Sequence, residues 1–191
     1  MWTMARSEGK GHRIPGWLEL VLCIVAGLLV ALVIRRYVAE VYIVPSGSML
    51  ETIQEGDRLI GEKVSIKTSS VSAGEIVTFT DPDDPSTTLV KRVVATGGQT
   101  VNLVDGKVYV DGKALDESYT LGKPSYPLDQ HSPSLQEAIS YPYVVPEGYV
   151  WVMGDNRTNS LDSRYFGAVS EDSITSHVVC VAWPPSDIGA L

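Results

Sequence analysis

An uninterrupted apolar run of 18 residues near the beginning of the chain sets the strongest limit on its fold. The run covers residues 17–34 (WLELVLCIVAGLLVALVI) and holds one charged residue, Glu19, in what would be its first turn. A helix of this length would be about 27 Å long, close to the hydrocarbon thickness of a bilayer. We therefore predict a membrane-spanning helix. The two alternatives are a cleaved secretory signal and a buried core helix.

The surrounding sequence favours an uncleaved anchor. The apolar part of a cleaved signal usually ends after about 15 residues, whereas this run is longer and is followed at once by Arg35 and Arg36. A core helix would have a polar face, and none is visible here. The orientation stays open, because Arg6, Lys10 and Arg13 before the run only slightly outnumber the two arginines after it.

Length and charge limit the part of the chain beyond the anchor. The chain has 191 residues, with 15 Lys and Arg against 23 Asp and Glu, which gives a formal net charge of -8. We expect a disordered tail at residues 1–16, the anchor at residues 17–36 and one domain at residues 38–186. The acidic balance disfavours a nucleic-acid partner. Cys23 lies in the apolar run and far from Cys180, so no disulfide is expected.

The residues after the anchor show the short runs of a mainly β domain. Runs rich in β-branched and aromatic residues are bounded by Gly, Pro, Asp or Ser, which predicts strands. They cover residues 38–44, 58–66, 75–80, 88–95, 101–115, 149–153 and 176–183. Within residues 101–115 the pairs Asp105-Gly106 and Asp111-Gly112 predict hairpin turns, and hence antiparallel sheets.

Two regions lack this pattern. Residues 117–143 are rich in Pro, Ser, Tyr and His, and we interpret them as an irregular excursion with at most a short helix near residues 134–139. The pair Pro184-Pro185 is expected to end the fold.

The sequence offers little support for a catalytic histidine or a metal site. His12, His131 and His177 lie in the tail, the excursion and a strand, and no His or Cys pair has the spacing of metal ligands. The acidic residues at 81–84 lie in a Pro-rich stretch typical of a solvated turn. We therefore predict neither a metal nor a cofactor.

Three short segments stand out as candidates for function. Residues 44–53 (VPSGSMLETI) interrupt a strand with small hydroxyl residues, residues 89–94 (LVKRVV) place two cations inside an apolar strand, and residues 154–167 (GDNRTNSLDSRYFG) are dense in Asp, Asn, Ser and Arg. Each has an ordinary explanation: a polar turn, a charged edge strand, or an Asx-rich loop. Adjacent strand residues point to opposite faces, so one of the two cations should point inward, and the third segment suggests a buried polar network.

In this order, the segments resemble the sequence boxes of the type I signal peptidases. PSGSM, GDRL, KRVV and GDNRTNSLDSRYFG follow one another from residue 45 to residue 167, and the apolar anchor precedes them. The resemblance implies a mostly β catalytic domain beside the membrane and a Ser-Lys dyad. It also implies a serine endopeptidase that removes N-terminal signal peptides from exported preproteins after an Ala-x-Ala-like site.

The resemblance assigns a role to individual positions. It places the nucleophile at Ser48, a hydroxyl that helps hold the oxyanion at Ser46 and the general base at Lys91. Ser160 matches a serine that orients the lysine through a hydrogen bond. Asp162 and Arg164 match residues that hold the catalytic residues in position without taking part in the reaction. Gly56 and Asp57 match a further box of the family that has a structural role.

The chemistry of the pair has a physical basis of its own. A free lysine titrates near 10.4, so at pH 7.5 about one in a thousand is neutral, equivalent to roughly 4 kcal/mol against base catalysis. Burial among apolar strand residues would lower the pKa of Lys91 and let it accept the Ser48 proton. Arg92 cannot replace it, because a guanidinium does not deprotonate in proteins.

The resemblance also implies the substrate pockets and the setting of the enzyme. Shallow apolar pockets for small residues of the leader are matched by Tyr42, Val44, Pro45, Met49, Ile53, Leu89 and Val90. The expected partners are signal-peptide-bearing preproteins and the lipid bilayer. We expect a monomer in the cell membrane, with its catalytic domain on the extracytoplasmic side.

Two departures from the family pattern and two alternative functions remain. Glu51 stands where the family usually has Pro, and residues 97–99 (GGQ) replace a usual Pro-Gly-Asp.

A self-cleaving Ser-Lys domain of repressor type would share the β architecture but not the anchor. A membrane-tethered domain that binds peptides without cutting them would have Ser48 as an ordinary turn residue.

Overall fold

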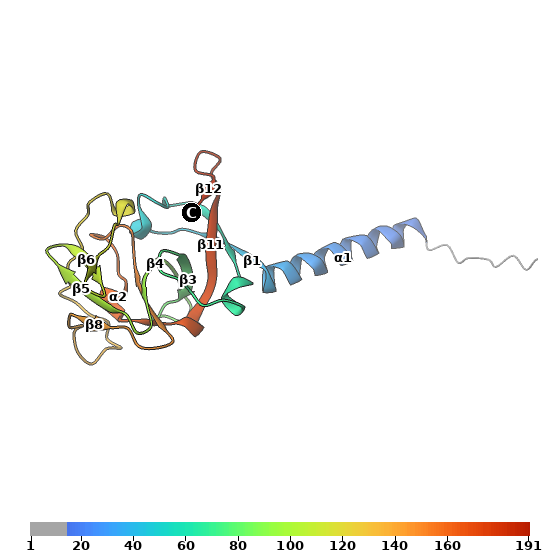
Figure 1. Cartoon of the computed structure of the whole chain (residues 1–191). Coiled ribbons are helices and arrows are strands. Elements are labelled where there is room, and N and C mark those ends of the chain that lie inside the picture. Colours follow the sequence, from blue (N-terminus) through green and yellow to red (C-terminus); the bar gives the residue numbers. More distant parts are fainter. Residues whose placement is uncertain (1–14) are drawn as a thin grey trace, which may run out of the picture.

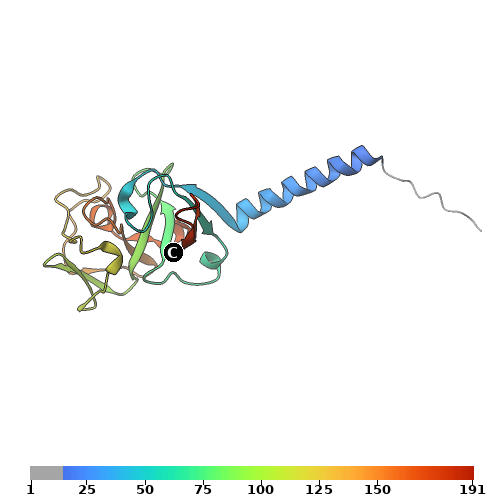
Figure 2. The same cartoon turned by 90° about the horizontal axis from the view of Figure 1, so that it is seen from above.

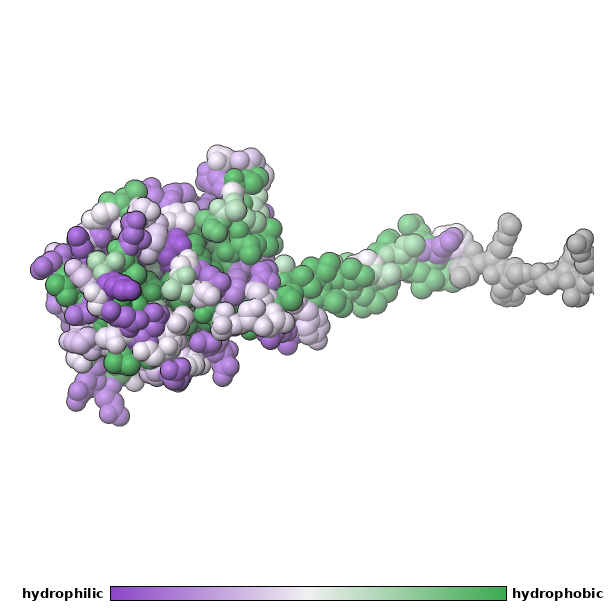
Figure 3. Space-filling view, viewed as in Figure 1, coloured by the Kyte–Doolittle hydropathy of each residue, from purple (hydrophilic) through white to green (hydrophobic). Residues whose placement is uncertain are grey.

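The computed structural model describes residues 15–191, so most of the expected N-terminal tail lies outside the described residues. A single long helix, α1 (Gly16–Tyr37), projects from a β-rich domain (Figure 1). None of its residues is buried, and it is the one helix in residues 15–191 that is long and apolar enough to cross a membrane. Apolar side chains cover its surface in Figure 3, which excludes a core helix.

The domain contains two antiparallel sheets. The larger runs in the order β1-β2-β11-β3-β4-β9-β10, with β12 paired to β11, and the smaller in the order β7-β6-β5-β8. The larger sheet consists of β1 (Ala39–Ile43), β2 (Arg58–Glu62), β3 (Ile76–Thr80), β4 (Thr88–Thr96), β9 (Tyr149–Met153), β10 (Val169–Ser170), β11 (Ile174–Trp183) and β12 (Gly189–Ala190). The smaller consists of β5 (Thr100–Val104), β6 (Lys107–Val110), β7 (Lys113–Ala114) and β8 (Tyr143–Val144). The mainly β prediction is confirmed.

Both predicted hairpin turns of the smaller sheet are present. Asp105 and Gly106 have φ values of 50° and 76°, and Asp111 and Gly112 have 51° and 76°. Positive φ at both central residues is the geometry of a type I′ turn, whose twist matches that of the flanking strands. The smaller sheet lies on the side of the domain away from α1, as Figures 1 and 2 show.

Three apolar clusters form the core. One lies between the sheets around Trp151, and one packs Phe79 against Phe166. The third joins β1, β2, β3 and β11 and includes Met49 and Ile53, which follow the predicted nucleophile in the chain. Burial of Met49 and Ile53 therefore fixes the turn that carries Ser48 to the body of the domain.

No helix forms near residues 134–139, which is within the prediction of at most a short one. Ser132 Oγ accepts a hydrogen bond from the Ser134 amide at 3.0 Å and also bonds Asp83, so the chain forms a local turn there. One prediction was wrong, because Pro184-Pro185 does not end the fold. The amide of Asp187 donates to the carbonyl of Pro184 at 3.0 Å, and the chain turns back as β12.

Candidate active site

Ser48 lies on a sharp turn between β1 and β2. Gly47, Ser48 and Met49 form a short 3-10 helix, preceded by Ser46 in extended conformation. A β-carbon on Gly47 would lie 2.8 Å from Leu50 Cδ1 and 2.9 Å from Glu55 Oε1, so a larger residue there would displace these two side chains. The first amides of a helix have no partner within it, so the Ser48 amide is free to bind an oxyanion. Ser46 caps no backbone amide of this helix with its side chain.

Lys91 reaches Ser48 from the middle of β4. Its Nζ lies 2.8 Å from Ser48 Oγ and donates to the carbonyl of Val90 at 3.1 Å. Only 3% of Lys91 is exposed. Arg92, the next residue, pairs instead with Asp155, as the alternation of a strand requires. Tertiary structure therefore brings together two side chains that are 43 residues apart in sequence.

Burial changes the titration of Lys91. It lowers the pKa of the amine from 10.5 to about 8, because the ammonium loses its hydration. The charges of Asp162, Asp81 and Asp155 act in the opposite direction and raise it. Since burial dominates, about a tenth of Lys91 is neutral at pH 7, and this neutral form can act as a general base.

A hollow of about 170 Å³ opens beside the pair. Its lining includes Ser46, Ser48 and Lys91 together with apolar residues from β1, the nucleophile turn and β4. All seven predicted pocket residues line it: Tyr42, Val44, Pro45, Met49, Ile53, Leu89 and Val90. Ile43, Thr87 and Thr88 complete the lining. Glu51 is exposed and lies outside this set, so the departure from the family pattern does not enter the hollow.

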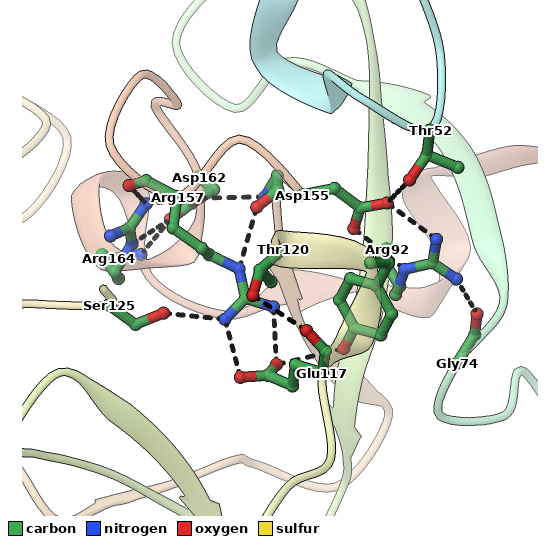
Figure 4. A network of polar contacts seen from close by, with 12 residues as sticks. Thr52, Gly74, Arg92, Glu117, Thr120, Ser125, Asp155, Arg157, Asp162 and Arg164 are labelled. Carbon is green, nitrogen blue, oxygen red and sulfur yellow. Dashed lines mark hydrogen bonds and ion pairs between the residues drawn. The ribbon is translucent and has the colours of Figure 1, made fainter. Parts of the chain in front are cut away.

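A network of buried ion pairs and hydrogen bonds joins the segments that carry Ser48 and Lys91 (Figure 4). Arg92 binds both carboxylate oxygens of Asp155 at 2.9 and 2.7 Å, and Thr52 donates to Asp155 at 2.6 Å. The Arg92 guanidinium also lies 4.1 Å from the ring centroid of Tyr119. Asp155 thus ties the nucleophile turn, through Thr52, to the strand that carries Lys91.

Two more arginines of the same loop are paired and buried. Arg164 binds Asp162 through Nε and Nη2 at 2.9 Å each, and the Asp162 carboxylate also accepts the Gly154 amide at 3.0 Å. Arg157 binds Glu117 at 2.6 Å. Glu117 belongs to the irregular excursion, so this segment helps to complete the network. The expected supporting residues, Asp162 and Arg164, lie within it.

Two polar residues of the loop differ from expectation in their contacts. Asn156, which no sequence pattern singles out, holds the turn twice: its side chain donates to the carbonyl of Gly47 at 2.8 Å and its amide to that of Ser48 at 3.1 Å. Ser160 does not form the expected hydrogen bond with Lys91. Its Oγ is buried and has no partner in the described part of the chain, so its orienting role stays a prediction.

The match to known proteins covers the anchor and the whole site. The model of the family described as signal peptidase, peptidase S26, matches residues 17–183. The chain is 38% identical to a probable signal peptidase I-1 from Synechocystis sp., over 91% of this chain and 86% of that protein. The chain belongs to the signal peptidase family. This excludes the repressor-type alternative.

Other relatives of this signal peptidase come from distant organisms. Signal peptidase I T of Bacillus subtilis is 35% identical over 88% of this chain and 86% of its own length. Thylakoidal processing peptidase 1 of Arabidopsis thaliana is 32% identical over 83% of this chain and 46% of its own length. The protein is therefore a hydrolase that cleaves signal peptides.

Neither histidine in residues 15–191 belongs to the site of this signal peptidase. His177 lies among Ser65, Glu62 and Glu75, with Nδ1 2.7 Å from Ser65 Oγ, and His131 lies in the irregular excursion. Neither lines the hollow beside Ser48. Within the same described residues, no three His, Cys, Asp or Glu side chains are grouped to hold a metal ion. The chemistry that the site residues offer is that of a serine and a lysine.

Proposed function

We propose that this signal peptidase is a membrane-bound serine endopeptidase in which Ser48 is the nucleophile and Lys91 the general base. The observation that carries the proposal is the 2.8 Å contact between Lys91 Nζ and Ser48 Oγ, with the lysine 3% exposed. A serine hydroxyl is a weak nucleophile until a neighbouring base takes its proton. A lysine serves as that base only when it is neutral, which burial favours.

The reaction follows from this geometry. Neutral Lys91 accepts the Ser48 proton as Ser48 Oγ attacks the carbonyl carbon of the scissile bond. The Ser48 amide and the Ser46 hydroxyl hold the resulting oxyanion. The Lys91 ammonium then protonates the leaving amine, which gives an acyl-enzyme on Ser48. A water molecule, deprotonated by the same lysine, hydrolyses the ester and restores both side chains.

The lining of the hollow supports cleavage after small apolar residues. It is mainly apolar, which suits alanine side chains better than charged ones, and its volume of about 170 Å³ leaves room for the side chains of two leader positions. β1 is an edge strand, and residues 88–91 of β4 pair only with β3 among the described residues. A leader peptide in extended conformation can hydrogen-bond to these open edges, so that affinity comes from main-chain contacts and specificity from the pocket.

The length and composition of α1 support a position of this chemistry at the membrane. With 22 residues, α1 is about 33 Å long, enough to span a bilayer. Apolar side chains on the adjoining strands are also exposed, including Val41, Ile43 and Trp183. We propose that the domain acts as a monomer on the extracytoplasmic side, where the leaders of exported preproteins emerge.

Hydrolysis of a peptide with an Ala-x-Ala leader end tests the dyad. We expect Ser48→Ala and Lys91→Ala to lose activity by at least 1000-fold, since each removes one of two groups that act together. Ser69→Ala and Lys113→Ala change exposed residues of the same types and should retain wild-type rates. Retained activity in both dyad variants would exclude the mechanism, and inactivity of the wild type would favour a peptide-binding module. Protease accessibility of the domain in intact cells tests its side of the membrane.

A further inference from the structure

Basic side chains gather where α1 meets the domain. Arg35 and Arg36 lie in the last turn of the helix, Lys63 directly follows β2, and Lys67 ends a short 3-10 helix at Ser65–Lys67. They line two hollows of about 340 and 300 Å³, which share Arg36 and Lys63. We call these joined hollows the basic cleft. Such a cluster is notable in a chain with a net charge of -8.

The one carboxylate that lines the basic cleft is already bound. Glu40 accepts a hydrogen bond from Lys63 at 2.5 Å and lies 4.0 Å from Arg35. The bond from Lys63 lowers the pKa of the Glu40 carboxyl, so that the carboxylate stays ionised. Lys63 also donates to the backbone carbonyl of Arg35 at 3.3 Å. These contacts fasten the end of the helix to the domain.

Arg36 and Lys67 remain available to a ligand. Neither forms an ion pair within residues 15–191, and both are exposed. The ammonium of Lys67 lies 5.3 Å from the ring centroid of Tyr37, which holds it beside the helix end. The cleft therefore has a net positive charge and at least two side chains with unused donors.

With α1 in the bilayer, as proposed above, the basic cleft would lie at the depth of the lipid headgroups. α1 has Trp17 near one end and Tyr37 at the other, and such aromatic residues prefer the two interfaces of a bilayer. With the apolar part of the helix in the hydrocarbon, Arg36 and Tyr37 lie at the boundary on the side of the domain. Figure 3 shows the change from an apolar helix to hydrophilic residues at this junction.

We propose that the basic cleft binds the phosphate group of an anionic phospholipid in the leaflet beside the catalytic domain. The proposal rests on the proposed membrane anchorage of the enzyme. A guanidinium donates two parallel hydrogen bonds to a phosphate, and a lysine adds a mobile charge. Leu32 and Ile66 supply apolar surface for the glycerol and the first methylenes of the lipid.

The charges also favour an anionic headgroup over a zwitterionic one. Choline or ethanolamine would bring its own cation into a cleft whose one carboxylate, Glu40, is held by Lys63. The carbonyl end of a helix carries partial negative charge and opposes an anion, but the Lys63 ammonium on the Arg35 carbonyl offsets this. The lipid would then hold the domain close to the bilayer surface.

Lipid binding to the full chain tests the proposal. The protein is reconstituted in vesicles of phosphatidylcholine with or without one fifth phosphatidylglycerol, and bound lipids are counted by native mass spectrometry after release into detergent. The variant Arg36→Gln/Lys67→Gln is compared with Lys107→Gln/Lys113→Gln, which removes two exposed charges from the distant smaller sheet. Each basic residue near an anionic surface contributes about fivefold to binding, so the first variant should bind phosphatidylglycerol roughly 30-fold more weakly.

Each outcome bears on the proposal. Retention of phosphatidylglycerol by the wild type and the Lys107/Lys113 variant, with loss in the Arg36/Lys67 variant, would support it. Equal binding by both variants, or no preference for phosphatidylglycerol in the wild type, would overturn it. Displacement of the lipid by millimolar glycerol phosphate would show a site for soluble phosphates instead. Wild-type protein that fails to remain with vesicles would refute the anchorage itself, and peptide hydrolysis in pure phosphatidylcholine tests the dyad separately.

Discussion

The pH dependence of peptide hydrolysis measures the environment of Lys91 directly. Only the neutral amine accepts the Ser48 proton, so kcat/KM should follow the neutral fraction of Lys91 in the free enzyme. Burial lowers the pKa of Lys91 to about 8. The neutral fraction then rises from about 9% at pH 7 to about 91% at pH 9, and kcat/KM should increase about tenfold. From pH 9 to pH 10 it should rise by only about a tenth.

A lysine with an ordinary pKa would give a different curve. With the value of 10.5, kcat/KM would increase roughly 100-fold from pH 7 to pH 9 and about eightfold more by pH 10. Initial rates on a quenched Ala-x-Ala peptide that lacks groups titrating in this range distinguish the two. Lys113→Ala, an exposed control, should reproduce the wild-type curve. A logarithmic rise that continues to pH 10 would refute the argument from burial.

Three further predictions concern the stability and shape of the site. Lys91→Met should stabilise the fold at pH 7 by up to about 3 kcal/mol, because the folded pKa of about 8 lies below the unfolded value. The free-energy cost of burying the Lys91 ammonium is fully present below pH 8 and absent above pH 10.5. Urea unfolding should therefore show that the extra stability of Lys91→Met over the wild type disappears at high pH. An extra stability that does not change with pH would contradict the reasoning. Asn156→Asp should lower kcat about tenfold to 100-fold with little change in KM, since the new carboxylate would repel the Gly47 carbonyl and tilt the oxyanion site. An unchanged kcat would show that the contact is dispensable. Gly154→Ala should abolish peptide hydrolysis while the protein still reaches the membrane, because a β-carbon there would overlap the backbone oxygen of Ser48; near-normal rates would mean that the turn can shift freely.

Much of this architecture was predictable because its causes are local. The apolar run of α1 needs only its own length and composition to indicate a span, and Asp-Gly pairs form I′ turns by backbone preference alone. The error at Pro184-Pro185 came from a partner elsewhere in the chain, because the return of the chain as β12 depends on pairing with β11. The turn at Ser132 likewise depends on Asp83, which lies in another segment.

The sequence by itself determined which residues are able to perform the chemistry. It indicated an anchor, a β domain, a serine on a small-residue turn and a lysine in an apolar strand. Only tertiary structure decided that the two meet, because Ser48 and Lys91 are 43 residues apart in the sequence. Their segments are joined through Asp155, which binds Thr52 although it lies 103 residues further along the chain. The pKa of Lys91 is likewise a property of the packed fold, since it depends on the loss of water around the amine and on carboxylates from other segments.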